Sequence, residues 1–191
     1  NQTPVRKKSV DGGSWVERPA TNHSHQPVFD MKYRKLGRNG PSVSAIGMGR
    51  GNVAIKFDDA PMVESFNATI RRAYDLGINF YDSSDAYWGT RHEVLLGRAI
   101  KGFRDKVIIS SKFGNIDLPD GKKATNGRPE YLQKCCEESL KRMDVEVIDL
   151  FYLHRVDPAV PIEETMGGMA RLVEQGKARW LGVCEAGPET L

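Results

Sequence analysis

Three short apolar runs each end in a side chain that can take part in catalysis, and this repeated arrangement limits the fold more than any other feature. The runs are residues 78–82, 107–112 and 147–154. Each is followed by a loop and then by a segment of helical periodicity, which is the order of elements in a βαβ unit. Asp82, Lys112 and His154 would therefore lie at the carboxyl ends of neighbouring parallel strands. Barrels and open α/β folds place their active sites there.

The rest of the chain continues this alternation. Asn39-Gly40 separates two alternating segments within residues 32–48 and predicts a β-hairpin. Four helices with an apolar stripe are expected, over residues 61–76, 92–101, 129–143 and 162–175. A long loop should follow residue 112, and a further strand is expected over residues 179–183. The strands are nearly continuous in apolar residues, which is typical of a parallel sheet buried on both faces.

Composition excludes several classes of protein. The net charge is +3, from 28 basic and 25 acidic residues, which is too balanced to indicate a nucleic-acid partner. We expect no membrane span, because no apolar run is long enough to cross a bilayer. The three cysteines show no CxxC spacing, so neither a disulfide framework nor a zinc site is expected. This pattern favours a reducing compartment, either the cytoplasm or an organelle matrix.

The first 30 residues differ from the rest. Residues 1–30 are polar, follow neither strand nor helix periodicity, and lack the apolar region of a secretory signal. We expect an extended arm here, poorly ordered or bound to a partner, followed by one folded domain over residues 31–191.

Asp82, Lys112 and His154, together with Tyr87 in the loop after the first of the three runs, form a candidate catalytic set. An ammonium beside a phenol stabilises the phenolate, which would suit Tyr87 for proton exchange with a carbonyl or alcohol oxygen. Asp82 would hold Lys112 in place, and His154 would orient the substrate oxygen. The set suits protonation of a developing alkoxide and would need a hydride source. The structural alternative is an ion pair that only fills the end of the barrel.

Other motifs carry less information. Residues 47–51 are glycine-rich but lack the GxGxxG spacing, so a Rossmann phosphate loop is not expected. His92 and Glu93 are interpreted as the start of a helix, and no metal site is expected. Trp88 could form a wall of a substrate pocket or simply pack against its neighbours.

The motifs taken together resemble the aldo-keto reductase superfamily over about residues 32–191. They are FYDSSDAY at 80–87, EVLLGRA at 93–99, SKFG at 111–114, DLFYLHR at 149–155 and GKARWLGV at 176–183. The stretch over residues 154–164 is similar to the branch that includes pyridoxal-reductase-like and auxin-induced-type members. The resemblance implies an α/β fold that is part of a TIM (β/α)8 barrel, with about five βα units after the hairpin and the arm. It also implies NADPH-dependent reduction of a small-molecule aldehyde or ketone.

The resemblance assigns roles to residues. Asp82, Tyr87, Lys112 and His154 match the family's catalytic tetrad, with Tyr87 as the general acid. For the cofactor, the resemblance implies contacts from Asp82 and from three other residues: Gly49, Cys184 and Glu185. Cys184 stands where this branch usually has serine, and Trp88 stands where a glycine commonly follows the tyrosine. Substrate-pocket positions are expected at Arg50, Trp88 and Phe113.

The length of the chain bears on three hypotheses about its function. An eight-stranded barrel needs roughly 250 residues, so we expect a catalytic chain to continue past Leu191. An incomplete barrel leaves a sheet edge that further chain or a protein partner must cover. The leading hypothesis is a carbonyl reductase represented by its N-terminal portion. The alternatives are a non-catalytic, aldo-keto-reductase-like structural subunit of a larger assembly, and a regulatory module that senses a nicotinamide cofactor.

Overall fold

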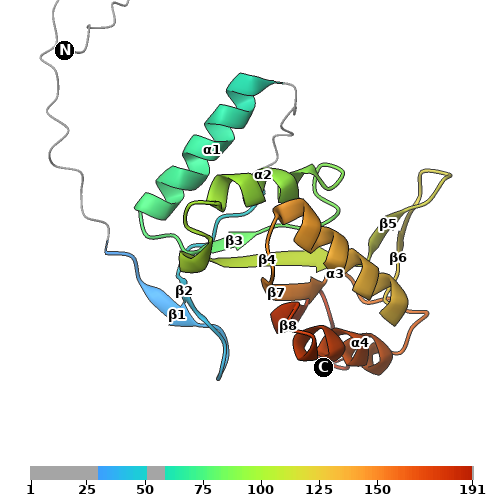
Figure 1. The fold of residues 1–191 in the computed structure, drawn as a ribbon. Coiled ribbons are helices and arrows are strands. Elements are labelled where there is room, and N and C mark those ends of the chain that lie inside the picture. Colours follow the sequence, from blue (N-terminus) through green and yellow to red (C-terminus); the bar gives the residue numbers. More distant parts are fainter. Residues whose placement is uncertain (1–29, 51–58, 191) are drawn as a thin grey trace, which may run out of the picture. The chain divides into compact units, whose positions relative to one another are not determined.

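The computed structural model describes residues 30–50 and 59–190. The expected arm lies outside the described residues, apart from Asp30, and so remains a prediction. Figure 1 shows the described elements, which in chain order are β1 (Tyr33–Lys35), β2 (Ser42–Ser44), α1 (Ala60–Asp75), β3 (Phe80–Asp82), α2 (Arg91–Ile100), a 3-10 turn (Arg104–Lys106), β4 (Ile108–Phe113), β5 (Asn115–Asp117), β6 (Lys123–Thr125), α3 (Pro129–Met143), β7 (Ile148–Leu153), α4 (Ile162–Glu174) and β8 (Ala178–Val183).

The central sheet is parallel and follows the order of the sequence. Its strands pair in the order β3-β4-β7-β8, and each consecutive pair is connected through a helix. Consecutive helices also pack against one another, from α1 to α4. A parallel bridge between Met48 and Tyr81 extends the sheet beyond β3. The predicted α/β fold with a partial barrel is therefore confirmed, with its first strand reduced to this bridge.

Local sequence explains where the helices begin and end. Asp59 accepts a hydrogen bond from the Met62 backbone N–H at 3.1 Å, which caps α1. Proline occupies the first turn of α1 and of α3, where its missing N–H has no helical partner. At the end of α3, Asp144 adopts a left-handed conformation with φ of 54°. The predicted bounds agree with the observed ones to within one or two residues.

The predicted long loop after residue 112 contains a small hairpin. β5 and β6 pair antiparallel, with Asn115 opposite Thr125, and project from the sheet in Figure 1. The turn between them includes Pro119-Asp120-Gly121, and Gly121 has φ of 80°. This sequence is a typical turn signal, so the hairpin was readable from the sequence but was not predicted.

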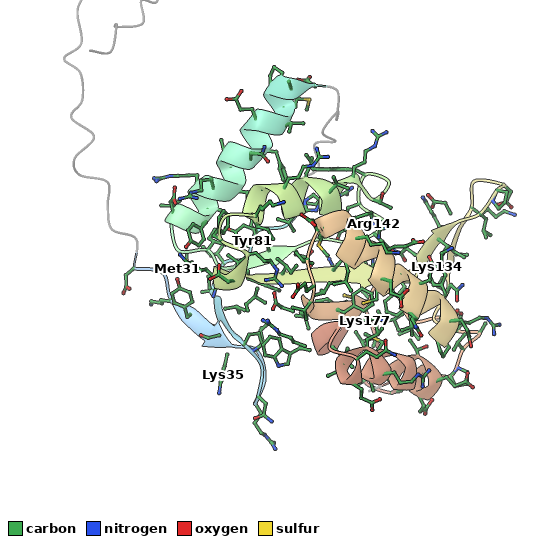
Figure 2. The ribbon with its side chains drawn as sticks, in the orientation of Figure 1. Met31, Lys35, Tyr81, Lys134, Arg142 and Lys177 are labelled. Carbon is green, nitrogen blue, oxygen red and sulfur yellow. The ribbon has the colours of Figure 1, made fainter. Side chains whose placement is uncertain are left out.

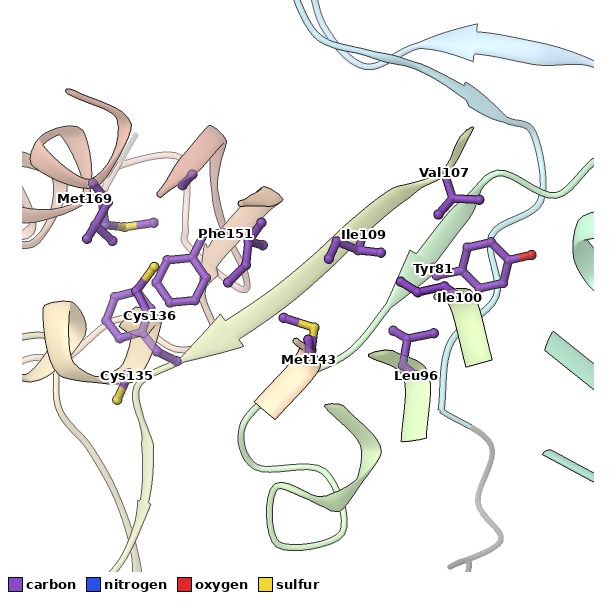
Figure 3. Packing of buried hydrophobic residues seen from close by; sticks show 14 of the residues in the cluster. Tyr81, Leu96, Ile100, Val107, Ile109, Cys135, Cys136, Met143, Phe151 and Met169 are labelled. Carbon is purple, nitrogen blue, oxygen red and sulfur yellow. The ribbon is translucent and has the colours of Figure 1, made fainter. Parts of the chain in front are cut away.

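The hydrophobic core lies between the sheet and the helices. Tyr81, Leu96, Ile109, Met143 and Phe151 are at most 1% exposed, and Figure 3 shows their packing. The phenol oxygen of Tyr81 lies 3.1 Å from the Ile78 carbonyl and 3.3 Å from the Ile70 carbonyl, and it can donate its single proton to either of them. Because Ile70 belongs to α1, the second contact ties β3 to that helix. None of the helices in residues 30–50 and 59–190 combines the length and apolar composition needed to cross a bilayer.

Phe113 was expected to line a substrate pocket, and the structure contradicts this. Its side chain is fully buried and stacks on Phe151 with ring centroids 5.1 Å apart. Successive side chains of a strand point to opposite faces. Because Lys112 faces the site, Phe113 must face the helices.

Candidate functional site

Strand register brings the predicted catalytic residues to one face of the sheet. Asp82 pairs with Ser110, and Lys112 pairs with Tyr152 of β7. The backbone N–H of His154 donates to the Phe113 carbonyl at 2.8 Å, which places His154 beside the end of β4. Residues two apart on a strand share a face, so Lys112 shares the face of Ser110, the partner of Asp82. His154 likewise follows Tyr152, the partner of Lys112, by two residues. All three side chains therefore point away from the helix-covered face.

Lys112 is at the centre of the site. Its side-chain Nζ lies 2.6 and 2.5 Å from the two carboxylate oxygens of Asp82 and donates to the Ser83 carbonyl at 2.7 Å. Ser110 donates to the same carboxylate at 2.6 Å. Lys112 is only 7% exposed. A buried ammonium is stable only when it is paired and hydrogen-bonded, and these contacts supply both.

Tyr87 reaches this cluster from the loop after β3. Its hydroxyl lies 3.3 Å from Nζ of Lys112. Backbone hydrogen bonds from Ser83 to Ser110 (2.9 Å) and from Asp85 to Lys112 (3.2 Å) hold the loop against β4. The position of the phenol is therefore fixed by the neighbouring strand and not by the loop alone.

His154 completes the cluster. Its ring lies edge-to-face with that of Tyr87, with centroids 5.8 Å apart. Its Nδ1 lies 3.2 Å from the Ser84 hydroxyl and 3.0 Å from the Asn115 amide nitrogen. Burial lowers the pKa of the His154 imidazole, and the Lys112 ammonium lowers it further. Both effects favour the neutral ring, which has one protonated nitrogen to offer as a donor.

The predicted cofactor residues lie along the same edge. Gly49 lies beside Asp82, because a Cβ at this glycine would be 3.8 Å from the Asp82 Cβ. Cys184 follows β8, and its backbone N–H donates to the Leu153 carbonyl at 2.9 Å. Glu185 forms a half-exposed ion pair with Arg155. All three residues lie at the carboxyl ends of strands, and their role in binding a cofactor remains a prediction.

Arg50 and Trp88, the two expected substrate-pocket residues, make different contacts. The Arg50 guanidinium lies 4.9 Å from the centroid of the Tyr87 ring. Trp88 contacts Phe66 and His92, with centroids 6.3 and 4.9 Å away. Trp88 also has φ of 53°, in the left-handed region where glycine is free of strain. The observed contacts of Trp88 are packing contacts with α1 and α2, whereas Arg50 lies against the ring of Tyr87.

A buried polar layer, which was not predicted from the sequence, lies beneath the site. His92 and Glu93 are 2% and 0% exposed, although they were interpreted only as the start of a helix. His92 Nδ1 lies 2.8 Å from the Ser83 hydroxyl, and Glu93 accepts from Ser111 at 2.5 Å. Burial lowers the pKa of His92 to about 4. Helical spacing could have indicated this burial. Glu93 precedes the inward-facing Leu96 by three residues and Ile100 by seven, so it lies on the same face of the helix.

Glu93 also pairs with a cation from a neighbouring helix. Arg142, which Figure 2 labels on α3, donates from Nε to Glu93 at 2.5 Å and from Nη2 to Ser139 at 3.0 Å. The site loop contributes one more acid to this region, since burial and the nearby Glu93 raise the pKa of Asp85 to about 7. Within the described part of the chain, no group of three or more His, Cys, Asp or Glu side chains could hold a metal ion.

Comparisons with known proteins agree with this geometry. The model of the aldo/keto reductase family matches residues 45–191. "Probable aldo-keto reductase 1" from Glycine max is 43% identical over 160 residues, which cover 82% of this chain and 46% of the relative. The chain thus spans about half the length of the relatives it matches.

Solved structures give the same result. The holo form of the aldo-keto reductase AKR11C1 from Bacillus halodurans superposes with a TM-score of 0.69 at 30% identity, over 80% of this chain and 50% of that one. A Klebsiella pneumoniae aldo-keto reductase in complex with NADPH gives a TM-score of 0.68 at 28% identity, over 84% and 51%.

Proposed function

Because the chain belongs to the aldo/keto reductase family, we propose that the complete protein uses NADPH to reduce a small aldehyde or ketone to an alcohol, with Tyr87 as proton donor. The observation that supports this most directly is the 3.3 Å contact between the Tyr87 hydroxyl and the buried Lys112 ammonium, which Asp82 holds in place. If the ion pair between Asp82 and Lys112 only filled the end of the barrel, it would not need the Tyr87 hydroxyl beside the ammonium. The branch within the family remains a prediction.

The residues at the strand ends fit one end of a nicotinamide cofactor. A primary carboxamide offers two donors and one acceptor. Glu185 can accept from it, and the Cys184 thiol can donate weakly. The ion pair between Glu185 and Arg155 is half-exposed and therefore costs little to open. The Klebsiella pneumoniae relative was solved with NADPH. When bound here, NADPH would supply the hydride to the carbonyl carbon.

The side chains of this chain would donate the proton and stabilise the charge that remains after its transfer. Tyr87 gives its proton to the oxygen of the developing alkoxide, and the Lys112 ammonium stabilises the phenolate that remains. Arg50 adds a second cation on the ring face of Tyr87. His154 donates a hydrogen bond that orients the substrate oxygen.

We also propose what covers the open edge of the sheet, in which compartment the protein acts, and that it has no nucleic-acid partner. In the described residues β8 pairs with β7 alone, and we expect further strands or a protein partner to cover its other edge in the complete protein. On the cysteine pattern alone, we expect the protein to act in the cytoplasm or an organelle matrix. We expect no nucleic-acid partner.

The test is Tyr87→Phe in the complete protein, with Tyr74→Phe as the matched loss of a phenol outside the site. NADPH consumption is followed with a panel of aldehydes and ketones, and NADPH affinity is measured by calorimetry. Tyr87→Phe should lower kcat by at least about 10²-fold and leave the cofactor affinity nearly unchanged. Tyr74→Phe should remain active.

Two results would count against the proposal. Full turnover in Tyr87→Phe would reject the proton-donor role. Absence of both NADPH binding and turnover in the unmutated protein would favour the non-catalytic structural subunit.

A further inference from the structure

The two hydrogen bonds at His154 Nδ1 have different chemical consequences. An amide nitrogen always donates, so the Asn115 contact at 3.0 Å requires a lone pair on Nδ1. A hydroxyl can either donate or accept, so the Ser84 contact at 3.2 Å imposes no such requirement. Asn115 is therefore the partner that determines which nitrogen of the neutral ring is protonated.

Other contacts of Ser84 compete for its single proton. The Ser84 hydroxyl also donates to Asp85 at 3.2 Å and accepts from the Ala86 backbone N–H at 3.2 Å. A hydroxyl has one proton, so Ser84 cannot donate to Asp85 and to His154 at once. The amide of Asn115 has two protons and does not face this competition.

We infer that Asn115 is a positioning residue that fixes His154 in the tautomer with Nδ1 unprotonated and Nε2 protonated. The inference rests on the proposed function, because the Nε2 proton is then the one offered to the substrate oxygen. The opposite tautomer would present a lone pair there and repel a developing alkoxide. Asn115 thus acts through His154 and need not touch the substrate.

The hairpin found in the structure is what places Asn115. Gly114 turns the chain out of β4 with φ of 110°, and its carbonyl accepts from the Asn126 backbone N–H at 2.8 Å. Asn115 opens β5 immediately after this turn. The backbone of His154 bonds to Phe113, only two residues before Asn115. The same short segment therefore fixes both the ring and its amide partner.

Charges around His154 favour a neutral ring in which a tautomer can be selected. Lys112 from β4 and Arg155 from the following residue both disfavour the imidazolium, while Asp82 from β3 favours it weakly. Ser84 and Asn115 are neutral side chains. The tautomer is then decided by hydrogen bonding and not by a neighbouring carboxylate.

The experiment reads the tautomer directly. Long-range proton–nitrogen correlation spectra of the complete protein, labelled in its histidines, separate protonated from unprotonated ring nitrogens, and His154→Gln assigns the signal. We expect Nε2–H in the unmutated protein. Asn115→Asp places an acceptor at Nδ1 and should move the proton there. Asn115→Ala should give a mixture of the two tautomers, and Ser84→Ala should retain Nε2–H.

Activity provides the second readout. Asn115→Asp should lower kcat by about 10²-fold, the size expected for losing one donor to a developing oxyanion, with the KM for NADPH little changed. Asn126→Asp, the same charge change on the neighbouring segment, should alter neither tautomer nor kcat.

Three outcomes would overturn the inference: Nδ1–H in the unmutated protein, Nε2–H retained in both Asn115 variants, or a switch caused by Ser84→Ala alone. The spectra remain decisive even if the protein shows no reductase activity, so the inference and the proposed function can fail separately.

Discussion

Substituting Arg142 by Met should destabilise the protein far more than deleting an exposed cation does. The reason is that the substitution leaves the carboxylate of Glu93 buried without its cation. Glu93 is fully buried, and Arg142 is its only cationic partner among the described ion pairs, at 2.5 Å. Removing one partner of a buried ion pair typically costs about 3–5 kcal/mol, because the other charge stays desolvated.

The structure places Arg142→Met near the lower end of that range. The Arg142 side chain is 19% exposed, and Ser111 continues to donate to Glu93 at 2.5 Å. We therefore expect a loss of about 3 kcal/mol in the free energy of unfolding. Glu93→Gln should cost less, about 1–2 kcal/mol, since the remaining cation can reach water and lies 3.6 Å from Glu138.

Urea unfolding of the two single variants and the double variant measures these values as a double-mutant cycle. The double variant should be more stable than Arg142→Met alone, because no buried charge remains. Lys101→Met is the matched control: its ion pair with Asp144 is almost fully exposed, and its loss should cost less than about 1 kcal/mol. Equal costs for Arg142→Met and Lys101→Met, or strict additivity in the cycle, would refute the reasoning.

Two other substitutions test the layers around the site. Asp85→Asn should change how stability depends on pH: the folded pKa of about 7 lies above the ordinary value of 3.8, so the stabilising contribution of Asp85 is full below pH 3.8 and is lost as pH rises through 7. Unfolding titrations should show a smaller fall in stability between these pH values in the variant, and identical pH profiles would contradict the assignment. Gly182→Ala would place a Cβ in steric overlap with the Tyr152 ring and should cost about 1–3 kcal/mol by the same unfolding assay. That cost should shrink in a Tyr152→Ala background, and an unchanged cost would show that the two side chains do not compete for space.

The parallel sheet and the positions of Asp82, Lys112 and His154 could be predicted because they follow from local patterns. Apolar runs mark the strands, and the last residue of a run must lie at the end of its strand. Helix ends were predictable for a similar reason, since proline at the first turn is a local signal.

Contacts between distant segments could not be predicted in this way. Glu93 and Arg142 are 49 residues apart, and only the packing of α2 on α3 shows that they are partners. No sequence pattern identifies Asn115 as a site residue, because its role depends on a hairpin and on a histidine 39 residues away. A buried charge on an apolar stripe does indicate that a partner must exist, even when the sequence does not identify it.

The site and the core depend on each other through strand register. On β4, Lys112 faces the site while Phe113 stacks on Phe151 in the core. A slip of one residue would exchange the two faces and bury the ammonium among apolar rings. The register that aligns Lys112 with Asp82 is therefore coupled to aromatic and aliphatic packing on the opposite face. It follows that substitutions which loosen the Phe113–Phe151 stack should disturb the position of Lys112 without touching any polar residue of the site.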